Sequence, residues 1–367
     1  MAIKGAHLVV NPADLTDAKI VPATFNDASE LSPGRVLLQI DSWSMTSNNV
    51  TYGRASGQLG YWEFFPVDDP VYGRIPVWGF ADVIASTVPE VEVGRRVYGF
   101  LPMSTHLEIE PGQITGRAMT DVVEHRANKS PIYNQYSFCD ADPIYRPEHE
   151  GLLSLFRPLY TTSFLLDDFF RANDFFGAEA VAITSASSKT SLGLAHALRA
   201  GGTGDVQVIG LTGTENVGFV EGSGLYDQVL SYDALDQITA DSLAYVDMAG
   251  NGDVRRSLHT RYGDELKHGC LVGGTHWTGR DRDVKDLPGP KPVFFFAPSY
   301  AQQRIAELGG AEFQTRLGNA WVSFLKDAVA WVDVVEQRGA ETALAVYLET
   351  VAGKVSPRTG NILALSE

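Results

Sequence analysis

The stretch that most constrains the fold is VAITSASSKTSLGLAHAL, which runs from Val181 to Leu198. It begins with a short β-prone run, passes through small hydroxyl residues, and continues with apolar residues at helical spacing. A second apolar run, Val206–Leu211, follows it and ends in Thr-Gly-Thr. This order is typical of a βαβ unit, in which the N-terminus of the helix is offered to a phosphate group.

The composition excludes several classes of protein. The 367 residues include 29 basic and 45 acidic ones, a net charge of −16, and no basic stripe, so we expect no nucleic-acid partner. Cys139 and Cys270 are too few for a disulfide framework or a four-thiolate zinc site. The sequence has no run of about 20 apolar residues and no pattern typical of a signal peptide, so we expect a cytoplasmic protein without a membrane partner.

The first part of the chain, to about residue 145, has the pattern of a β-rich domain. Short β-prone runs at Arg35–Ile40, Gly79–Ser86, Gly94–Phe100 and His106–Ile109 are separated by Pro, Gly and Glu. This spacing predicts a barrel-like domain with antiparallel pairing. The polar and aromatic segment Ala118–Tyr145 is predicted to be a long surface loop.

The middle part alternates between strand and helix patterns. A helix is expected over about 146–176, followed by strands at 181–184, 206–211, 228–231, 243–247 and 269–274 that alternate with helices at 190–200, 214–222 and 252–262. Strands separated by helices predict a parallel, doubly wound sheet. In the tail, apolar residues from Gly318 to Gly339 have helical spacing, and Asn361–Leu365 is predicted to be the last strand.

The order of these parts resembles the medium-chain dehydrogenase/reductase superfamily. The strings LSPGRVLLQIDSWSMTSNNVTYG, GRIPVWGFADVIAS, VEVGRRVYGF, VIGLTGTEN, VDMAGN, GCLVGGTHW and PRTGNILAL are similar to segments of that family in the same order. The resemblance implies an α/β protein in which a discontinuous GroES-like catalytic domain, residues 1–145 and 292–367, accompanies a Rossmann dinucleotide-binding domain, residues 146–291.

The chain departs from the alcohol dehydrogenases of this superfamily at their metal sites. Where they have a Gly-His-Glu string, this chain has Gly79-Phe80-Ala81, and the earlier ligand position falls on Ser44 or Met45. Phe and Ala cannot hold a catalytic zinc ion, so no metal is expected. The chain therefore resembles the zinc-free quinone and enoyl reductases, and within them a poorly characterised branch.

The phosphate loop also differs, because the glycines common in the family are replaced by Ala186-Ser187-Ser188-Lys189-Thr190-Ser191. Hydroxyl groups can donate to phosphate oxygens, and a lysine adds a positive charge. We therefore expect Ser187, Ser188, Lys189 and Thr190 to contact the cofactor. The alternative is that these residues only cap the following helix.

Two further segments concern the cofactor. Thr212 and Thr214 end the second central strand with neutral hydroxyls and Glu215 follows, so NADP(H) is favoured over NAD(H); the alternative is that both threonines cap the next helix. The resemblance places Gly273, Gly274 and Thr275 against the nicotinamide, although paired glycines are also typical of an ordinary turn. His276 is a minor catalytic candidate.

The candidate catalytic residues are Tyr52, Asn49 and Tyr160. Asn49 and Tyr52 lie in a predicted loop, where similar reductases place a polar or tyrosine side chain that orients a carbonyl group; a phenol can donate a proton to a forming enolate. Tyr160, in the helix before the Rossmann unit, is the rival proton donor. An aromatic-rich stretch either lines an apolar pocket or belongs to the core; it contains Trp62, Phe64, Phe65, Tyr72 and Trp78.

Together these features predict a zinc-independent, NADPH-dependent reductase of an activated C=C or C=O bond in a small molecule, which could be aromatic. The alternatives are a lyase or isomerase that uses a bound nucleotide without net redox chemistry, and a non-catalytic nucleotide-binding protein. A homodimer is expected to form through the sheet edge near Gly269–Gly274.

Overall fold

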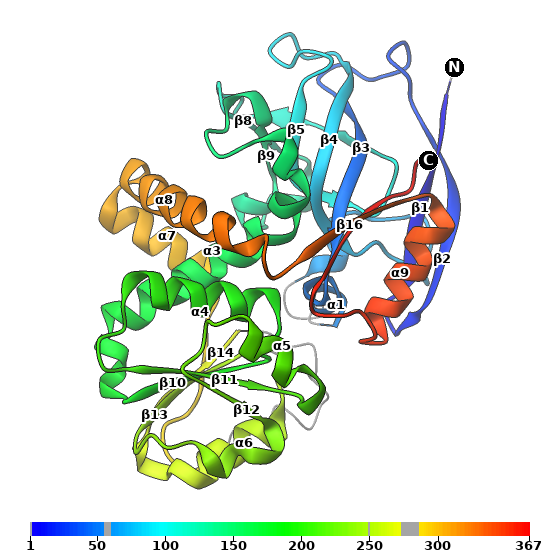
Figure 1. Cartoon of the computed structure of the whole chain (residues 1–367). Helices are drawn as coiled ribbons and strands as arrows, with labels where there is room; N and C mark the ends of the chain where they lie inside the picture. Colours follow the sequence, from blue (N-terminus) through cyan, green and yellow to red (C-terminus); the bar gives the residue numbers. More distant parts are fainter. Residues whose placement is uncertain (1, 55–59, 249, 273–285) are drawn as a thin grey trace. The chain divides into compact units, whose positions relative to one another are not determined.

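Two sheets, each in a compact unit of its own, organise the chain (Figure 1). This computed structural model describes residues 2–54, 60–248, 250–272 and 286–367. One unit comprises Met1–Leu155 with Asp333–Glu367, and the other comprises Phe156–Val332. The first is a β-rich GroES-like domain and the second a Rossmann domain, which confirms the predicted fold class.

The first unit is built on a nine-stranded sheet with the order β16-β17-β3-β4-β5-β9-β8-β7, in which β6 also pairs with β3. Its strands are β3 (Val36–Met45), β4 (Pro76–Ser86), β5 (Arg96–Pro102), β6 (His106–Ile109), β7 (Pro111–Gly112), β8 (Ala118–Asp121), β9 (Gln135–Phe138), β16 (Asp333–Arg338) and β17 (Thr359–Ala364). A separate hairpin of β1 (Ile3–Asn11) and β2 (Asp14–Phe25), with helices α1 (Ser47–Arg54) and α9 (Ala340–Val351), completes the unit.

Close packing of β3 and β4 requires Gly79. A Cβ added there would lie 2.7 Å from the Cα of Trp43 and would overlap the carbonyl oxygen of Ser42. The glycine that opens the Gly-Phe-Ala string thus brings β4 against β3. Arg96 of β5 links neighbouring elements, because its guanidinium group donates hydrogen bonds to the carboxylates of Asp41 in β3, Asp82 in β4 and Glu150.

The second unit contains a six-stranded sheet in which every pairing is parallel, with the order β12-β11-β10-β13-β14-β15. Its strands are β10 (Ala180–Thr184), β11 (Gln207–Thr212), β12 (Gln228–Ser231), β13 (Leu243–Asp247), β14 (Leu266–Leu271) and β15 (Val293–Phe294). Counted from β10, this is the 3-2-1-4-5-6 order of the Rossmann fold. After β10 the chain adds β11 and β12 on one side and then β13, β14 and β15 on the other side. A crevice therefore forms at the carboxyl ends of the strands next to β10, where this fold binds its ligands.

Helices cover the parallel sheet (Figure 1). The helices that accompany this sheet are α3 (Glu150–Ala172), α4 (Lys189–Gly201), α5 (Val217–Gly222), α6 (Gly252–Tyr262), α7 (Ala297–Leu308) and α8 (Gly310–Ala328). Of these, α4, α5 and α6 contact the strands, whereas α8 packs on α4. Apolar side chains of the strands, such as Val181, Ile183 and Ile209, are fully buried. This burial explains why the central strands are continuous apolar runs in the sequence.

Several predicted elements differ in the structure. Residues 47–54 form helix α1 rather than a loop, because the side chain of Asn49 accepts the N–H of Thr46 and the turn is continued by hydrogen bonds. The prediction of a surface loop over 118–145 was wrong, because it contains β8 and β9 and buries Met119 and Tyr136 completely. The predicted helix over 146–176 is shorter, Glu150–Ala172.

The tail also differs from the prediction. The helical pattern from Gly318 to Gly339 ends at Ala328, and Asp333–Arg338 forms β16 because it pairs in parallel with β17. Among the described residues, β15 forms one edge of the parallel sheet and β12 the other, so the described part of the predicted edge strand is not at the edge: Cys270 is the partner of Val293 in β15. The boundaries between the two compact units lie after residues 155 and 332, whereas the sequence suggested boundaries after residues 145 and 291. Helices α7 and α8 belong to the unit with the parallel sheet because α8 packs on α4.

None of the helices in the described part of the chain is both long and apolar enough to cross a lipid bilayer.

Candidate nucleotide-binding site

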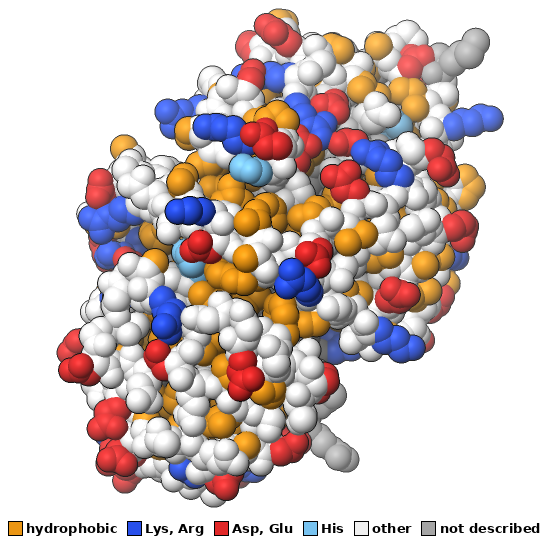
Figure 2. Space-filling view, viewed as in Figure 1, with side chains coloured by type: hydrophobic (Ala, Val, Ile, Leu, Met, Phe, Trp, Pro, Cys, Tyr) orange, Lys and Arg blue, Asp and Glu red, His pale blue; other side chains and the backbone are white. Residues whose placement is uncertain are grey.

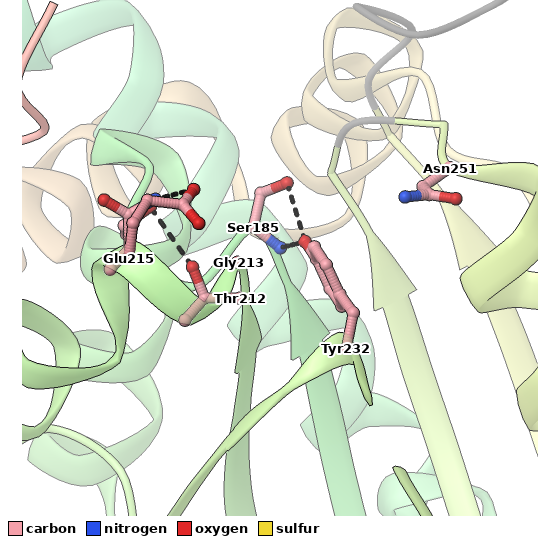
Figure 3. A pocket seen from close by; sticks show the side chains of 8 residues that line it. Ser185, Thr212, Gly213, Glu215, Tyr232 and Asn251 are labelled. Atoms are coloured by element: carbon pink, nitrogen blue, oxygen red, sulfur yellow. Dashed lines mark hydrogen bonds between the residues drawn. The ribbon is translucent and has the colours of Figure 1, made fainter. Parts of the chain in front are cut away.

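A pocket of about 230 Å³ opens at the carboxyl edge of the parallel sheet (Figure 3). Its described lining residues follow four consecutive strands: Ser185 and Ser187 after β10, Thr212, Gly213, Glu215 and Asn216 at and after β11, Tyr232 after β12, and Asn251 after β13. Pockets for whole ligands enclose roughly 300–1,000 Å³, so this one has room for only part of a ligand of that size. Parallel α/β sheets bind their ligands at this edge.

A tyrosine from the 3-10 helix after β12 bonds the turn that leaves β10. The backbone N–H of Ser185 donates to the hydroxyl of Tyr232 at 2.8 Å, and the two hydroxyl groups lie 3.3 Å apart (Figure 3). Ser185 has a φ angle of +47°, a region that non-glycine residues seldom adopt. Burial raises the pKa of Tyr232, and the nearby carboxylates of Asp247 and Glu215 raise it further.

Helix α4 begins directly after this turn. Ser188 is its N-cap: its side chain accepts the N–H of Ser191 at 3.2 Å and also donates to the Ser191 hydroxyl. The first backbone N–H groups of a helix have no partners inside the helix, and together with the helix dipole they favour an anion. Ser188 therefore caps the helix, while its contact with a cofactor stays a prediction.

Lys189 and Thr190 form the first turn of α4. Lys189 is half-buried, and burial lowers the pKa of its amino group to about 8. The carbonyl of Thr190 accepts the hydroxyl of Ser163 in α3 at 2.7 Å, which fixes the start of α4 against α3. At neutral pH the amino group is still mostly protonated, and a positive charge at a helix N-terminus is a suitable partner for a diphosphate.

The end of β11 supplies further hydroxyl groups. Thr212 is buried and its hydroxyl lies 3.4 Å from that of Ser187, so these two predicted residues lie on the same side of the pocket. Thr214 is exposed, and its hydroxyl contacts Asp233 rather than lining the pocket. Glu215 extends back over Gly213 and accepts a hydrogen bond from the side chain of Asn216 at 3.0 Å.

The loop after β13 is anchored by a buried acid. Oδ1 of Asp247 accepts hydrogen bonds from the hydroxyl of Thr184 at 3.2 Å and from the N–H of Gly250 at 2.8 Å. Asn251 then caps α6 by accepting the N–H groups of Asp253 and Val254. These bonds fix the position at which Asn251 borders the pocket.

Of the described lining residues, the sequence predicted only Ser187 and Thr212 as cofactor contacts; those it did not predict are Ser185, Gly213, Glu215, Asn216, Tyr232 and Asn251. Each comes shortly after the carboxyl end of a predicted parallel strand, and that position was the signal which could have identified them. The predicted residues Gly273, Gly274, Thr275 and His276 lie outside the described residues.

The candidate catalytic residues of the β-rich unit lie in α1. Both ends of the Asn49 amide are used: Oδ1 accepts from Thr46, and Nδ2 donates to the carbonyl of Pro76 at 3.1 Å. The hydroxyl of Tyr52 accepts a hydrogen bond from Nε1 of Trp78 at 3.2 Å. Burial raises the pKa of Tyr52, so its phenol stays protonated at neutral pH.

Tyr160 lies in the other unit, in α3, and holds two helices together. Its ring stacks on Phe324 of α8 at 4.1 Å between centroids, and its hydroxyl donates to the carbonyl of Ala320 at 3.0 Å. Burial raises the pKa of Tyr160. A phenol that already donates its proton within the core is poorly suited to supply that proton to a substrate.

The aromatic-rich stretch packs into the core of the β-rich unit. Phe64, Phe65 and Trp78 are buried and surround Phe100, at centroid distances of 4.9 to 6.2 Å. Trp62 donates to the carbonyl of Gly53, and Tyr72 donates to Asp17.

The described part of the chain holds no group of three or more His, Cys, Asp or Glu side chains that could bind a metal ion. On the face shown in Figure 2, lysines and arginines are scattered among acidic residues.

Comparison with known proteins identifies the family. Residues 43–356 match the family model described as a protein of unknown function, DUF2855. The chain belongs to this family. None of the curated proteins is similar enough in sequence to match it.

Solved structures of the same fold span nearly the whole chain. CurA from Vibrio vulnificus in complex with NADPH has a TM-score of 0.61 at 12% identity over 99% of both chains. The CurK enoyl reductase has a TM-score of 0.56 at 12% identity over 98% of both chains. A putative NADPH:quinone reductase from Bacillus thuringiensis has a TM-score of 0.52 at 11% identity over 98% of this chain and 99% of its own. This chain therefore has the same fold as these proteins.

Proposed function

We propose that this protein is a zinc-independent, NADP(H)-dependent reductase that delivers a hydride to an activated C=C or C=O bond of a small molecule. The observation that carries the proposal is the hydroxyl-lined pocket at the carboxyl edge of β10 and β11, next to the N-terminus of α4. Similarity in fold to CurA, which was solved with NADPH, and to enoyl and quinone reductases supports the same assignment.

The residues present fit a dinucleotide without the usual glycines. The turn from Ser185 to Ser188 places small side chains before α4, and Lys189 provides a positive charge for the diphosphate. Ser187 and Thr212 offer hydroxyl donors on the β11 side, where the adenosine ribose and its 2′-phosphate bind in proteins of this fold. When bound, NADPH supplies the hydride.

Tyr52 is the proton donor that we favour for the β-rich unit. Its raised pKa keeps a proton at Oη, and the hydrogen bond from Trp78 fixes the direction of the ring. Tyr52 can thus donate a hydrogen bond to a substrate oxygen on which negative charge develops, and can release the proton to it. Asn49, whose amide is occupied by Thr46 and Pro76, positions α1 and does not contact substrate in this proposal.

The proposal extends to a homodimer formed through β15. In the part of the chain that the structure describes, this strand is one of the two edges of the parallel sheet, and its side chains Val293 and Phe294 are 55% and 47% exposed. An exposed apolar edge strand favours pairing with a second copy. Light scattering should give twice the monomer mass for the wild type and a monomer for Phe294→Glu.

The experiment that tests the function has two stages. Purified protein is first titrated with NADPH while nicotinamide fluorescence is followed, and NADPH oxidation is then measured with a panel of enones and quinones. Binding and turnover together are the expected result. If NADPH binds but none of the enones and quinones is reduced, the reductase proposal is contradicted and a nucleotide-binding protein is favoured.

A further inference from the structure

The nucleotide pocket contains one charged side chain among its described lining residues, the carboxylate of Glu215. Glu215 does not end β11, where an acid that recognises ribose is usually expected; it lies three positions beyond Thr212, in the short helical turn Thr214–Asn216. In the sequence, neutral hydroxyl residues precede this acid, and that order favours NADP(H).

The geometry of the turn brings the carboxylate back. A Cβ added to Gly213 would lie 2.7 Å from Oε2 and 2.8 Å from Cδ of Glu215, and would overlap Oε1. The side chain thus covers the α-carbon of Gly213, which itself lines the pocket. Asn216 donates a hydrogen bond to Oε1 at 3.0 Å and holds the carboxylate there.

Glu215 is an exposed residue that lines the pocket together with Tyr232. Its carboxylate is the smallest of the causes that raise the pKa of Tyr232, after burial and the carboxylate of Asp247. An anion at this position repels a 2′-phosphate, whereas it accepts hydrogen bonds from free ribose hydroxyls.

We propose that Glu215, folded back over Gly213, sets the nucleotide selectivity of this pocket by lowering its affinity for the 2′-phosphorylated form, so that the protein accepts both NADPH and NADH. The proposal rests on the function proposed above. The hydroxyl groups of Ser187 and Thr212 admit the 2′-phosphate, and the carboxylate limits how strongly it is preferred.

Gly213 makes the proposal testable by a second, independent variant. Its backbone angles, φ −68° and ψ 150°, are ordinary for any residue, so alanine causes no backbone strain. The added methyl group contacts only the end of the flexible Glu215 side chain among its three nearest neighbours. Gly213→Ala therefore displaces the carboxylate without removing it.

The test measures dissociation constants for NADPH and NADH by nicotinamide fluorescence at low salt. It compares the wild type with Glu215→Gln, Gly213→Ala, the double variant, and the control Glu221→Gln, an exposed acid of α5 that does not line the pocket. In the wild type, the two constants should lie within about tenfold of each other. Both single variants should shift the ratio towards NADPH by about five- to tenfold, and the double variant by no more than Glu215→Gln alone.

The outcomes separate the inference from the function on which it depends. If both nucleotides bind and Glu215→Gln leaves the ratio unchanged, the selectivity role is wrong while the proposed function stands. A wild-type preference for NADPH far above tenfold would also overturn the inference. If neither nucleotide binds at millimolar concentration, the proposed function fails and the inference fails with it.

Discussion

The phenolic oxygen of Tyr232 accepts the backbone N–H of Ser185 at 2.8 Å, and so joins the end of β12 to the turn between β10 and α4. The two residues are 47 positions apart in the sequence. The contact shapes the pocket wall and pairs a backbone group of a residue with positive φ. It explains how a turn without the usual glycines keeps a fixed conformation.

Tyr232→Phe removes this acceptor and leaves the N–H of Ser185 unpaired. We expect the free energy of unfolding to fall by about 1 kcal/mol and the affinity for NADPH to fall about fivefold, because the turn loses its support. Urea denaturation and fluorescence titration measure the two effects. Tyr262→Phe is the matched control, since it removes a hydroxyl that donates to the carbonyl of Ala240 outside the pocket; an equal loss of affinity in the control would contradict the role of Tyr232.

The affinity for NADPH should decrease as the pH rises through about 8. Burial lowers the pKa of Lys189 to about 8, so its amino group is charged below that pH and neutral above it, and the attraction for a diphosphate is lost on the alkaline side. Titrations between pH 6.5 and 9.5 should show this decrease in the wild type and little of it in Lys189→Met.

Lys326→Met, which changes an exposed lysine of α8, is the control for net charge. It should keep the pH dependence of the wild type. The assignment of the titrating group to Lys189 is wrong if Lys189→Met retains the full decrease.

Tyr52→Phe and Tyr160→Phe should separate chemistry from packing. Tyr160 donates to the carbonyl of Ala320, so its loss should lower the free energy of unfolding by about 1 kcal/mol with kcat nearly unchanged. Tyr52→Phe should reduce kcat about a hundredfold while the affinity for NADPH is kept, because a proton donor contributes roughly 10²–10⁴-fold. Thermal denaturation and steady-state kinetics on an accepted substrate decide between them; the reverse pattern would exchange their roles.

Arg96 should make the β-rich unit sensitive to acid. Burial of Asp41 opposes its ionised form, but hydrogen bonds from Arg96 and Arg338 outweigh this effect and lower its pKa. A carboxyl group with a lowered pKa in the folded state stabilises the protein above its unfolded pKa of about 4, and this contribution is lost as the pH falls further.

Arg96→Met should therefore lower the free energy of unfolding by about 2 kcal/mol at pH 7, since three carboxylates lose a shared partner that is itself only partly exposed. The difference between variant and wild type should narrow below about pH 4. Denaturation at pH 7 and pH 3.5 tests this, and a difference that stays constant with pH would contradict it.

The sequence predicts the central strands β10 and β13 well because each is a continuous buried run of mostly apolar residues. The runs at 181–184 and 243–247 differ from β10 and β13 by at most one residue at an end. Such strands can be predicted from their own residues, since both of their faces are covered by helices and their side chains are therefore apolar on both sides. The elements it misses depend on partners far away in the chain.

Residues 333–338 illustrate this dependence. Val334 and Val335 continue a helical spacing that starts with Trp321, yet they form β16 because β17, more than 20 positions later, pairs with them. In the same way, the polar residues Asn48 and Asn49 favour a loop by propensity, and α1 forms because Asn49 bonds Thr46 and Pro76. Local patterns do not contain such partners.

The candidate site was predicted only in part, for a related reason. Ser187 and Thr212 were identified from their own strings, and the fold brings their hydroxyls to 3.4 Å. Tyr232 and the folded-back carboxylate of Glu215 were not, because one depends on strand order and the other on the absence of a Cβ at Gly213.

Isothermal titration calorimetry of the purified protein with NADPH tests the central claim most directly, since the whole account requires that the turn before α4 and the adjoining pocket hold a dinucleotide. We predict one site per chain with a micromolar dissociation constant, weakened at least tenfold when Ser188→Ala and Lys189→Met are combined. No heat of binding up to millimolar NADPH or NADH, or an unchanged affinity in the combined variant, would contradict the claim.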